Sequence, residues 1–240
     1  MEAINKTVDE ILNELKYFGN ENTKKIFLKH GAKEPFYGVK VQDLKKIVKK
    51  VKKNHELSLA LYDTGNSDAM YLAGLIADEN KITKSELNKW ANSAYWYMIS
   101  EYTVAWVAAE SRYALELALD WIDSDKENIA SAGWATLSNY IALKADEELD
   151  IPLYSKLLDR VEKDIHQAQN RVRYTMNGFV ISVGTSIEAL TKKATSTAES
   201  IGKVKVNVGT TSCKVPLATD YIQKVFVRGT IGKKRKTARC

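Results

Sequence analysis

Aromatic rings and carboxylates that could act on a cationic ligand are concentrated in the middle of the chain. All five tryptophans lie between positions 90 and 134, and Glu101 follows Trp96 closely in this stretch. A purine alkylated at N3 or N7 carries a positive charge that attracts electron-rich rings, and a carboxylate can stabilise the oxocarbenium ion developing on its sugar. Trp96 and Glu101 are therefore candidate catalytic residues for the removal of such a base.

Other interpretations of these residues stay open. Trp106 and Glu110 are spaced i and i+4, which also places a ring and a carboxylate on one helical face. The sequence does not choose between Glu101 and Glu110. Aromatic rings also dominate protein cores, and a single glutamate in an aromatic helix is commonly a structural residue.

The sequence predicts neither a metal site nor a cofactor. His30, His55 and His166 are scattered, and none has a cysteine at ligand spacing. No glycine-rich loop of the nucleotide-binding kind is present. Cys213 and Cys240 are too few for a disulfide scaffold, so we expect a reducing cytoplasm and two ordinary thiols.

Charge is segregated along the chain. Residues 24–53 carry eleven lysines and two acids, residues 54–191 carry eleven basic and twenty-one acidic side chains, and residues 192–240 carry twelve basic and two acidic ones. Two basic segments around an acidic middle favour a polyanion that touches both ends of the molecule, and nucleic acid is the first candidate. A solubilising role for the lysines is the alternative from charge alone.

One helix expected in the first basic segment has a strongly positive face. Val41, Leu44 and Ile47 repeat at helical spacing, and lysines cover the rest of the circumference. We expect DNA contacts from this face, from two arginines further along and from the basic C-terminus. The predicted DNA-binding residues are Lys45, Lys46, Lys49, Lys50, Arg171, Arg173, Lys233, Lys234, Arg235, Lys236 and Arg239.

Helices must position these residues, because turn-forming residues are rare. The chain has 12 glycines and 3 prolines in 240 residues, and apolar positions recur at helical spacing as far as about residue 201. Pairs of short helices at intervals of roughly 35 to 45 residues predict an all-α fold, an α-solenoid of HEAT-like helix pairs.

The last forty residues follow another pattern. Valines at 204, 206 and 208 alternate with polar residues, which predicts a small β-hairpin, and one further helix precedes Gly229. The residues after Gly229 include no core-forming series and read as a mobile tail. The expected segments are a helical-repeat domain over 1–201, a hairpin–helix extension over 202–228 and a basic flexible tail over 229–240.

No membrane segment is expected. The longest nearly uncharged run, residues 91–109, contains Glu101 and several tyrosines and is shorter than the ~20 apolar residues of a membrane span. The N-terminus lacks the pattern of a secretory signal. We therefore expect a cytoplasmic monomer.

Four stretches carry a family resemblance. They are Phe36-Tyr-Gly-Val-Lys-Val-Gln-Asp-Leu-Lys-Lys-Ile47, Tyr95-Trp96-Tyr97, Trp121-Ile122 with Ser124-Asp125, and Asn177-Gly178-Phe179-Val180. Together they resemble the HEAT-like-repeat DNA alkylation repair family, the AlkD-like DNA glycosylase superfamily. The glycine-containing ending after residue 202 looks like that of a less characterised branch of this family.

The resemblance implies a helical solenoid whose concave basic face holds duplex DNA without flipping the base fully into a pocket, unlike most enzymes that act on bases. It implies a catalytic aspartate within residues 96–101, where this sequence offers only Glu101. It also implies an arginine near residues 131–133, which is absent, and a late tryptophan, which appears as Phe179. Phe179 joins the predicted DNA-binding residues, and the chain resembles a divergent branch that lacks the usual catalytic aspartate.

Three functions follow for testing. The first is a DNA-binding protein that recognises duplex, damaged or branched DNA through a basic concave face, with weak or no base excision. The second is an active DNA glycosylase that removes N3- or N7-alkylated purines with Glu101 as its carboxylate. The third is a protein-interaction scaffold, the common use of α-solenoids, which would bind through the acidic middle.

Overall fold

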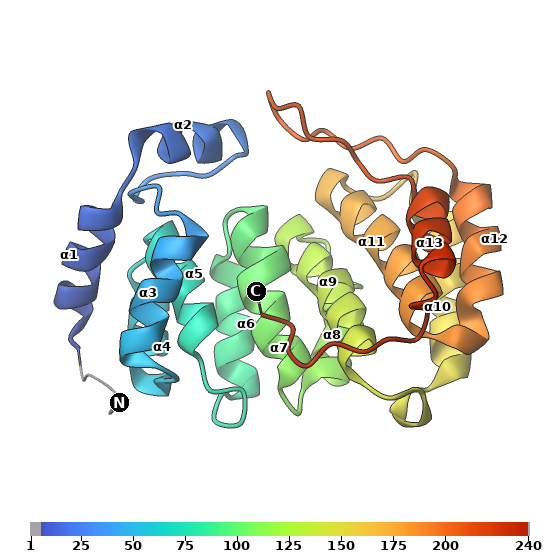
Figure 1. Cartoon of the computed structure of the whole chain (residues 1–240), viewed down its shortest axis with the longest axis horizontal. Helices are drawn as coiled ribbons and strands as arrows, with labels where there is room; N and C mark the ends of the chain where they lie inside the picture. Colours follow the sequence, from blue (N-terminus) through green and yellow to red (C-terminus); the bar gives the residue numbers. More distant parts are fainter. Residues whose placement is uncertain (1–5, 240) are drawn as a thin grey trace.

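The computed structural model describes residues 6–239 and builds them almost entirely from helices (Figure 1). The described residues form thirteen α-helices, one π-helical turn (η1) and two short 3-10 turns (η2 and η3). Their bounds are α1 Val8–Phe18, α2 Glu21–Lys29, α3 Val41–Val51, α4 His55–Asp63, α5 Ser67–Ile76, α6 Lys84–Ser93, η1 Met98–Val104, α7 Ala105–Glu110, α8 Ala114–Trp121, α9 Glu127–Leu143, η2 Asp146–Glu148, α10 Ile151–Asp164, α11 Asn170–Ser186, η3 Glu188–Leu190, α12 Thr191–Ile201 and α13 Ala218–Val227.

The helices stack side by side as pairs joined by short loops, which confirms the predicted all-helical solenoid (Figure 1). α4 packs on α5, α8 on α9, and α12 on α10 and α11. α9 lies at the centre of the stack, where it also contacts α7, η1 and α11. Each helix thus buries a face against a partner and a flank against its neighbours along the stack.

α5, α7, α9 and α11 run parallel and form what we call the parallel layer. Residues at or before the starts of η1, α9 and α11 line a single cleft. At the opposite end, the last turns of α5, α7, α9 and α11 all contact the same C-terminal segment. The layer therefore has an N-terminal edge, which faces the cleft, and a C-terminal edge.

Two apolar clusters, one in each half of the chain, hold the stack together. Trp90 stacks on Tyr62 with ring centroids 4.1 Å apart, and Trp134 meets Phe179 edge-on at 5.1 Å. Burial of such large rings is the main favourable contribution to folding. Among residues 6–239, no helix is long and apolar enough to cross a membrane.

Glycines let several helices approach one another closely. A Cβ built on Gly74 would lie 2.7 Å from Thr103 Cγ2, and one built on Gly184 would lie 2.6 Å from Ile222 Cδ1. The second contact seats α13 against α11, and Ile222 is buried there. A larger residue at either glycine would push these helices apart.

The predicted β-hairpin is wrong, because residues 202–217 contain no strand within the described chain. Both limbs pack on helices, since Val204 is buried and Val206 and Val215 cover the apolar interior. α11 holds the limbs by side-chain amides: Asn170 exchanges two hydrogen bonds with the Asn207 backbone, and Asn177 donates to the Pro216 carbonyl at 2.9 Å. We call this segment the C-terminal loop (Figure 1).

The sequence predicts a mobile basic tail, but in the structure the tail packs against the helices. Residues 230–239, which we call the strap, cross the C-terminal edge of the parallel layer (Figure 1). Arg239 donates to the Ala77 carbonyl at 2.7 Å and forms ion pairs with Glu79 and Glu110 at 2.9 and 3.0 Å. Lys234 pairs with Asp146 at 2.7 Å. Positive charge is favourable here because helix C-termini carry partial negative charge. Cys240 lies outside the described residues.

Candidate nucleic-acid cleft

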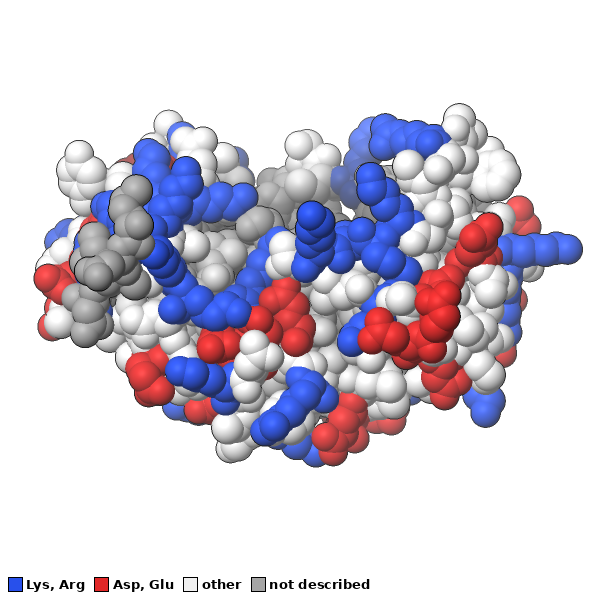
Figure 2. All heavy atoms as spheres, turned by 60° about the horizontal axis from the view of Figure 1, so that its bottom comes forward, with Lys and Arg blue, Asp and Glu red and all other residues white. Residues whose placement is uncertain are grey.

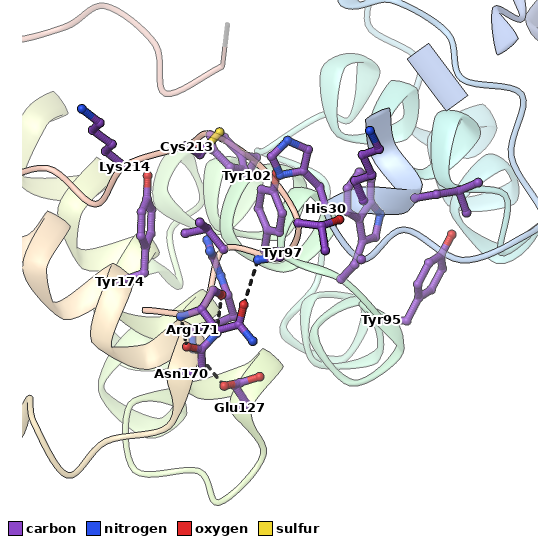
Figure 3. A pocket seen from close by; sticks show the side chains of 18 residues that line it. His30, Tyr95, Tyr97, Tyr102, Glu127, Asn170, Arg171, Tyr174, Cys213 and Lys214 are labelled. Atoms are coloured by element: carbon purple, nitrogen blue, oxygen red, sulfur yellow. Dashed lines mark hydrogen bonds between the residues drawn. The ribbon is translucent and has the colours of Figure 1, made fainter. Parts of the chain in front are cut away.

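A cleft of about 620 Å³ opens at the N-terminal edge of the parallel layer (Figure 3). Its floor is made by the segment before η1 and by the first turns of α9 and α11, and its walls are the end of α2 and the C-terminal loop. Three cationic side chains and one acid line it, so the described lining is net positive. These four are Lys29, Arg171, Lys214 and Glu127.

The two walls meet at a glycine. Gly209 in the C-terminal loop has a φ of +77°, and a Cβ built there would lie 2.3 Å from the Lys29 carbonyl oxygen. A side chain at this position would both strain the backbone and collide with α2. The loop and the end of α2 therefore bridge the cleft at Gly209 and Lys29.

One of the predicted DNA-binding arginines holds the loop wall. Arg173, predicted to bind DNA, donates from Nε to the Ala168 carbonyl at 2.6 Å and from Nη1 to the Lys205 carbonyl at 3.4 Å. These bonds fix the start of the C-terminal loop on α11. The structure thus gives Arg173 a part in shaping the cleft wall.

Glu101 and Arg171 form a two-pronged ion pair beneath the cleft. Arg171 Nε donates to Glu101 Oε1 at 2.7 Å, and Arg171 Nη2 donates to Glu101 Oε2. Glu101 lies in the π-helical turn η1, a geometry that is frequent at functional sites, and its side chain is only 3% exposed. Both carboxylate oxygens therefore face the guanidinium and not the open cleft.

The same guanidinium is enclosed by aromatic rings. Its carbon lies 4.3 Å from the ring centroid of Tyr97 and 4.3 Å from that of Tyr174, so Arg171 is held between the two rings. Tyr95 and Tyr102 add two more phenols to the cleft lining (Figure 3). An aromatic cage with a carboxylate at its base is an arrangement that binds a cation, and here the protein's own arginine fills it.

Burial decides the protonation of these groups. Desolvation raises the pKa of Glu101 to about 7, although Arg171 lowers it. Burial also raises the pKa of Tyr97 and of Tyr102 to about 12, and it raises the pKa of Tyr174. The phenols therefore keep their protons at neutral pH and can donate hydrogen bonds to an anion.

Two aromatic residues predicted for the site are buried. Trp96 is 7% exposed, and its indole Nε1 donates to Ser67 Oγ at 2.8 Å, so only an edge of it reaches the cleft. Its catalytic role stays a prediction. Phe179 is fully buried against Trp134, which corrects the expectation that it contacts DNA. Helical spacing from Val172 already places Phe179 on an inward face, and core packing uses that face.

The alternative carboxylate, Glu110, is an anchor for the strap. Its carboxylate accepts the backbone N–H of Ala238 at 2.7 Å and the hydroxyl of Thr237, and it pairs with Arg239. Glu110 lies at the C-terminal end of α7, at the opposite edge of the parallel layer from Glu101. The structure therefore separates the two carboxylates that the sequence left as alternatives.

The strap divides its cations into two groups. Lys234 and Arg239 turn inward to ion pairs and carbonyl groups, as described above. Lys233, Arg235 and Lys236 are exposed. Only the second group is free to meet a polyanion without breaking the ion pairs that hold the strap.

The lysines of α3 divide in the same way. Lys46 pairs with Asp43 at 2.7 Å, and Lys50 pairs with Glu14. Lys45 and Lys49 are exposed, and neither has an ion-pair partner among residues 6–239. Lys45 and Lys49 are thus the α3 cations that are available for phosphate groups.

The two basic segments share one face of the molecule. Figure 2 shows Lys and Arg side chains over the N-terminal part and in a band along the strap, with acidic side chains concentrated below the band. The segments meet at Glu79, which accepts Lys53 at 2.6 Å and Arg239 at 2.9 Å. The two basic segments are therefore close enough for one polyanion to touch both.

No group of three or more His, Cys, Asp or Glu side chains capable of holding a metal ion occurs among the described residues.

The sequence alone did not reveal several residues that the fold brings to the cleft. Tyr97 with Glu101, and Arg171 with Tyr174, are spaced four and three residues apart, so each pair shares a helical face. That spacing was a signal for the cage, but the sequence could not show that the two faces meet. Lys29 and Lys214 carried no such signal, because only the folded chain brings the end of α2 and the C-terminal loop to the cleft.

Comparisons with known proteins agree with this architecture. A family described as DNA alkylation repair enzyme matches residues 11–202. Two uncharacterized proteins, from Listeria monocytogenes and Listeria innocua, are each 40% identical over 224 residues, which covers 91% of this chain and 96% of each relative. One solved structure has a TM-score of 0.91 at 38% identity, and the match covers 98% of this chain and 100% of that one. It is described as a new family of proteins related to the HEAT-like repeat DNA glycosylases with affinity for branched DNA structures.

Proposed function

The chain belongs to the DNA alkylation repair enzyme family, and from this premise we propose that it binds duplex, damaged or branched DNA through the cleft and the basic face, with weak or no base excision. The relative of known structure, which is described as having affinity for branched DNA, supports DNA as the partner and branched DNA as a form to test first.

One observation supports weak or absent base excision: Arg171 binds both carboxylate oxygens of Glu101. A carboxylate that assists glycosidic cleavage must lie near the sugar, where positive charge develops. Both Glu101 oxygens instead accept from Arg171, and the Tyr97 and Tyr174 rings hold that arginine in place. The cage that could receive an alkylated purine is already filled by a cation of the protein.

The same groups suit the binding of DNA. Arg171 lines the cleft and uses Nε and Nη2 for Glu101, which leaves Nη1 without a hydrogen-bond partner among the described residues. The neutral phenols of Tyr97 and Tyr102 can donate to phosphate oxygens, and their rings can stack on unpaired bases. Lys29 and Lys214 add charge from the two walls, which would strengthen binding at low salt.

Binding and excision can be measured on the same DNA. We expect fluorescence anisotropy to show binding of a duplex and tighter binding of three-way and four-way junctions of the same length. We expect no release of 7-methylguanine from duplex DNA above the level of Glu101→Gln. Release by the wild type that Glu101→Gln abolishes would establish the active glycosylase instead. Absence of DNA retention at low salt would contradict DNA binding and favour a protein-interaction scaffold.

A further inference from the structure

We propose that a second hollow, between α9, α11, α13 and the strap, is a binding site for the sugar–phosphate backbone of DNA. Its volume is about 600 Å³, and it lies toward the C-terminal edge of the parallel layer, away from the aromatic cleft. The proposal rests on the DNA-binding function above and names the part of the DNA that this region recognises.

The floor of this hollow is low and combines short polar side chains with apolar ones, such as Ala142 and Ile181. Ser138 and Asn139 of α9 and Ser182 and Thr185 of α11 line it with short side chains. At Gly178, nothing lies within 4 Å of a Cβ built on the backbone, so the helix surface is open to the hollow there. A nucleic-acid strand can therefore approach close to the helix backbones.

The rim is cationic. Arg228 at the end of α13 and Lys233 and Arg235 of the strap line the hollow and are exposed. Lys234 lines it as well, although its ammonium turns to Asp146 and to the Ser186 carbonyl. No acidic side chain is among the described residues of the lining, so the hollow favours an anion.

The strap holds its exposed cations in fixed places. The Gly232 N–H donates to the Thr185 carbonyl at 2.9 Å, and the Arg235 N–H donates to the Ala142 carbonyl at 2.7 Å. Arg235 Nη2 also donates to the Ala238 carbonyl at 2.9 Å. The backbone of Lys233 and the whole of Arg235 are therefore held in place before a ligand arrives, which lowers the entropy lost on binding.

The chemistry of the lining selects a backbone phosphate rather than a base. Arginine and lysine pair with phosphate oxygens, and the exposed cations of the rim are available for such contacts. No aromatic ring is among the described residues of the lining, so the hollow offers no stacking surface for an unpaired base. Unpaired bases would stack on Tyr97 and Tyr102 in the cleft. The hollow would bind the backbone and so fix the register of the strand.

A charge-matched pair of triple variants tests the site. The first is Arg228→Gln, Lys233→Gln and Arg235→Gln, which removes three exposed cations but keeps the strap anchors. The control is Lys156→Gln, Lys163→Gln and Lys192→Gln, which removes three exposed cations from α10 and α12. We expect the slope of log Kobs against log salt to fall by about 0.9 for each phosphate that the first variant no longer binds, and to stay unchanged in the control. Equal slopes in the two variants would overturn the site.

Gly178→Met provides an uncharged test, because its side chain would stand in the hollow. We expect it to weaken binding several-fold without lowering the melting temperature or changing 7-methylguanine release. Ethylation of single phosphates should reveal one cluster whose modification blocks wild-type binding and has no effect on the first triple variant. If wild type binds DNA and both tests leave affinity unchanged, the hollow is not a backbone site although the proposed function holds. If wild type does not bind DNA, the proposed function itself fails. If the wild type binds no DNA but binds poly-glutamate through the same three cations, its partner is an acidic protein instead.

Discussion

Arg171 on α11 reaches Glu101 in η1 and binds both of its carboxylate oxygens, with Nε 2.7 Å from Oε1. The two residues lie 70 positions apart in the chain. Their pairing joins the first turn of α11 to the π-helical turn across the floor of the cleft. The pairing takes up both oxygens of the carboxylate and fixes the orientation of the guanidinium.

Removing the arginine should destabilise the protein. Arg171→Ala leaves Glu101 buried without its cation, and breaking a buried ion pair in this way costs about 3–5 kcal/mol. Urea denaturation would measure the free energy of unfolding. Glu101→Gln with Arg171→Met, which removes both charges, should recover part of the loss. A double variant as unstable as Arg171→Ala would contradict a charge effect.

The stability of the protein should depend on pH through Glu101. The pKa of this carboxyl is about 7 in the folded chain, against 4.5 as its ordinary value. A raised pKa means that its contribution is fully present below pH 4.5 and is lost as the pH rises through about 7. The free energy of unfolding of wild type relative to Glu101→Gln should therefore decrease across that window. A difference that is constant from pH 4.5 to 7.5 would show that Glu101 is charged throughout.

Two glycines of α11 should respond in opposite ways to alanine. Gly178→Ala meets open space and reduces the freedom of the unfolded chain, so it should stabilise the protein by about 0.5–1 kcal/mol. Gly184→Ala places a Cβ 2.6 Å from Ile222 Cδ1, and overpacking of this kind costs about 1–3 kcal/mol. Thermal and urea unfolding of the two variants would check the signs. Stabilisation by both would mean that α13 packs more loosely than described.

The strap should stabilise the fold through its inward cations only. Arg239→Gln removes ion pairs to Glu79 and Glu110 from a poorly exposed site, and we expect a loss of about 1–3 kcal/mol. Lys236→Gln is the control, because this side chain is exposed and should change stability by less than about 0.5 kcal/mol. Chemical denaturation distinguishes them. Equal stability of both variants and wild type would show that the ion pairs do not hold the strap.

DNA affinity should depend on two of the four lysines of α3. Lys45→Gln with Lys49→Gln removes cations without an ion-pair partner in the described chain, whereas Lys46→Gln with Lys50→Gln removes cations already engaged by Asp43 and Glu14. We expect the first pair to reduce the salt slope by up to about 0.9 per phosphate bound and the second to reduce it less. Identical slopes would mean that internal ion pairing does not restrict these lysines.

Much of the fold could be predicted because it depends on local pattern. The buried stripe of α3, with Leu44, Ile47 and Val51, repeats at helical spacing, and short loops force neighbouring helices to pair. The predicted hairpin was wrong because it also rested on local pattern alone. Alternating valines show that one side of an extended segment is buried, but not whether a strand or a set of helices buries it.

The candidate site was predictable only in part. The sequence supplied the ring and carboxylate chemistry, the segregated charge and the individual residues Glu101 and Arg171. It could not show that these two residues pair or that Glu110 binds the strap, because each contact joins segments far apart in the chain. The sequence by itself determined the helical stack and the supply of cations. Only the tertiary structure decided which cations are consumed internally and which face solvent, because ion pairing depends on three-dimensional distance and burial rather than on position along the chain.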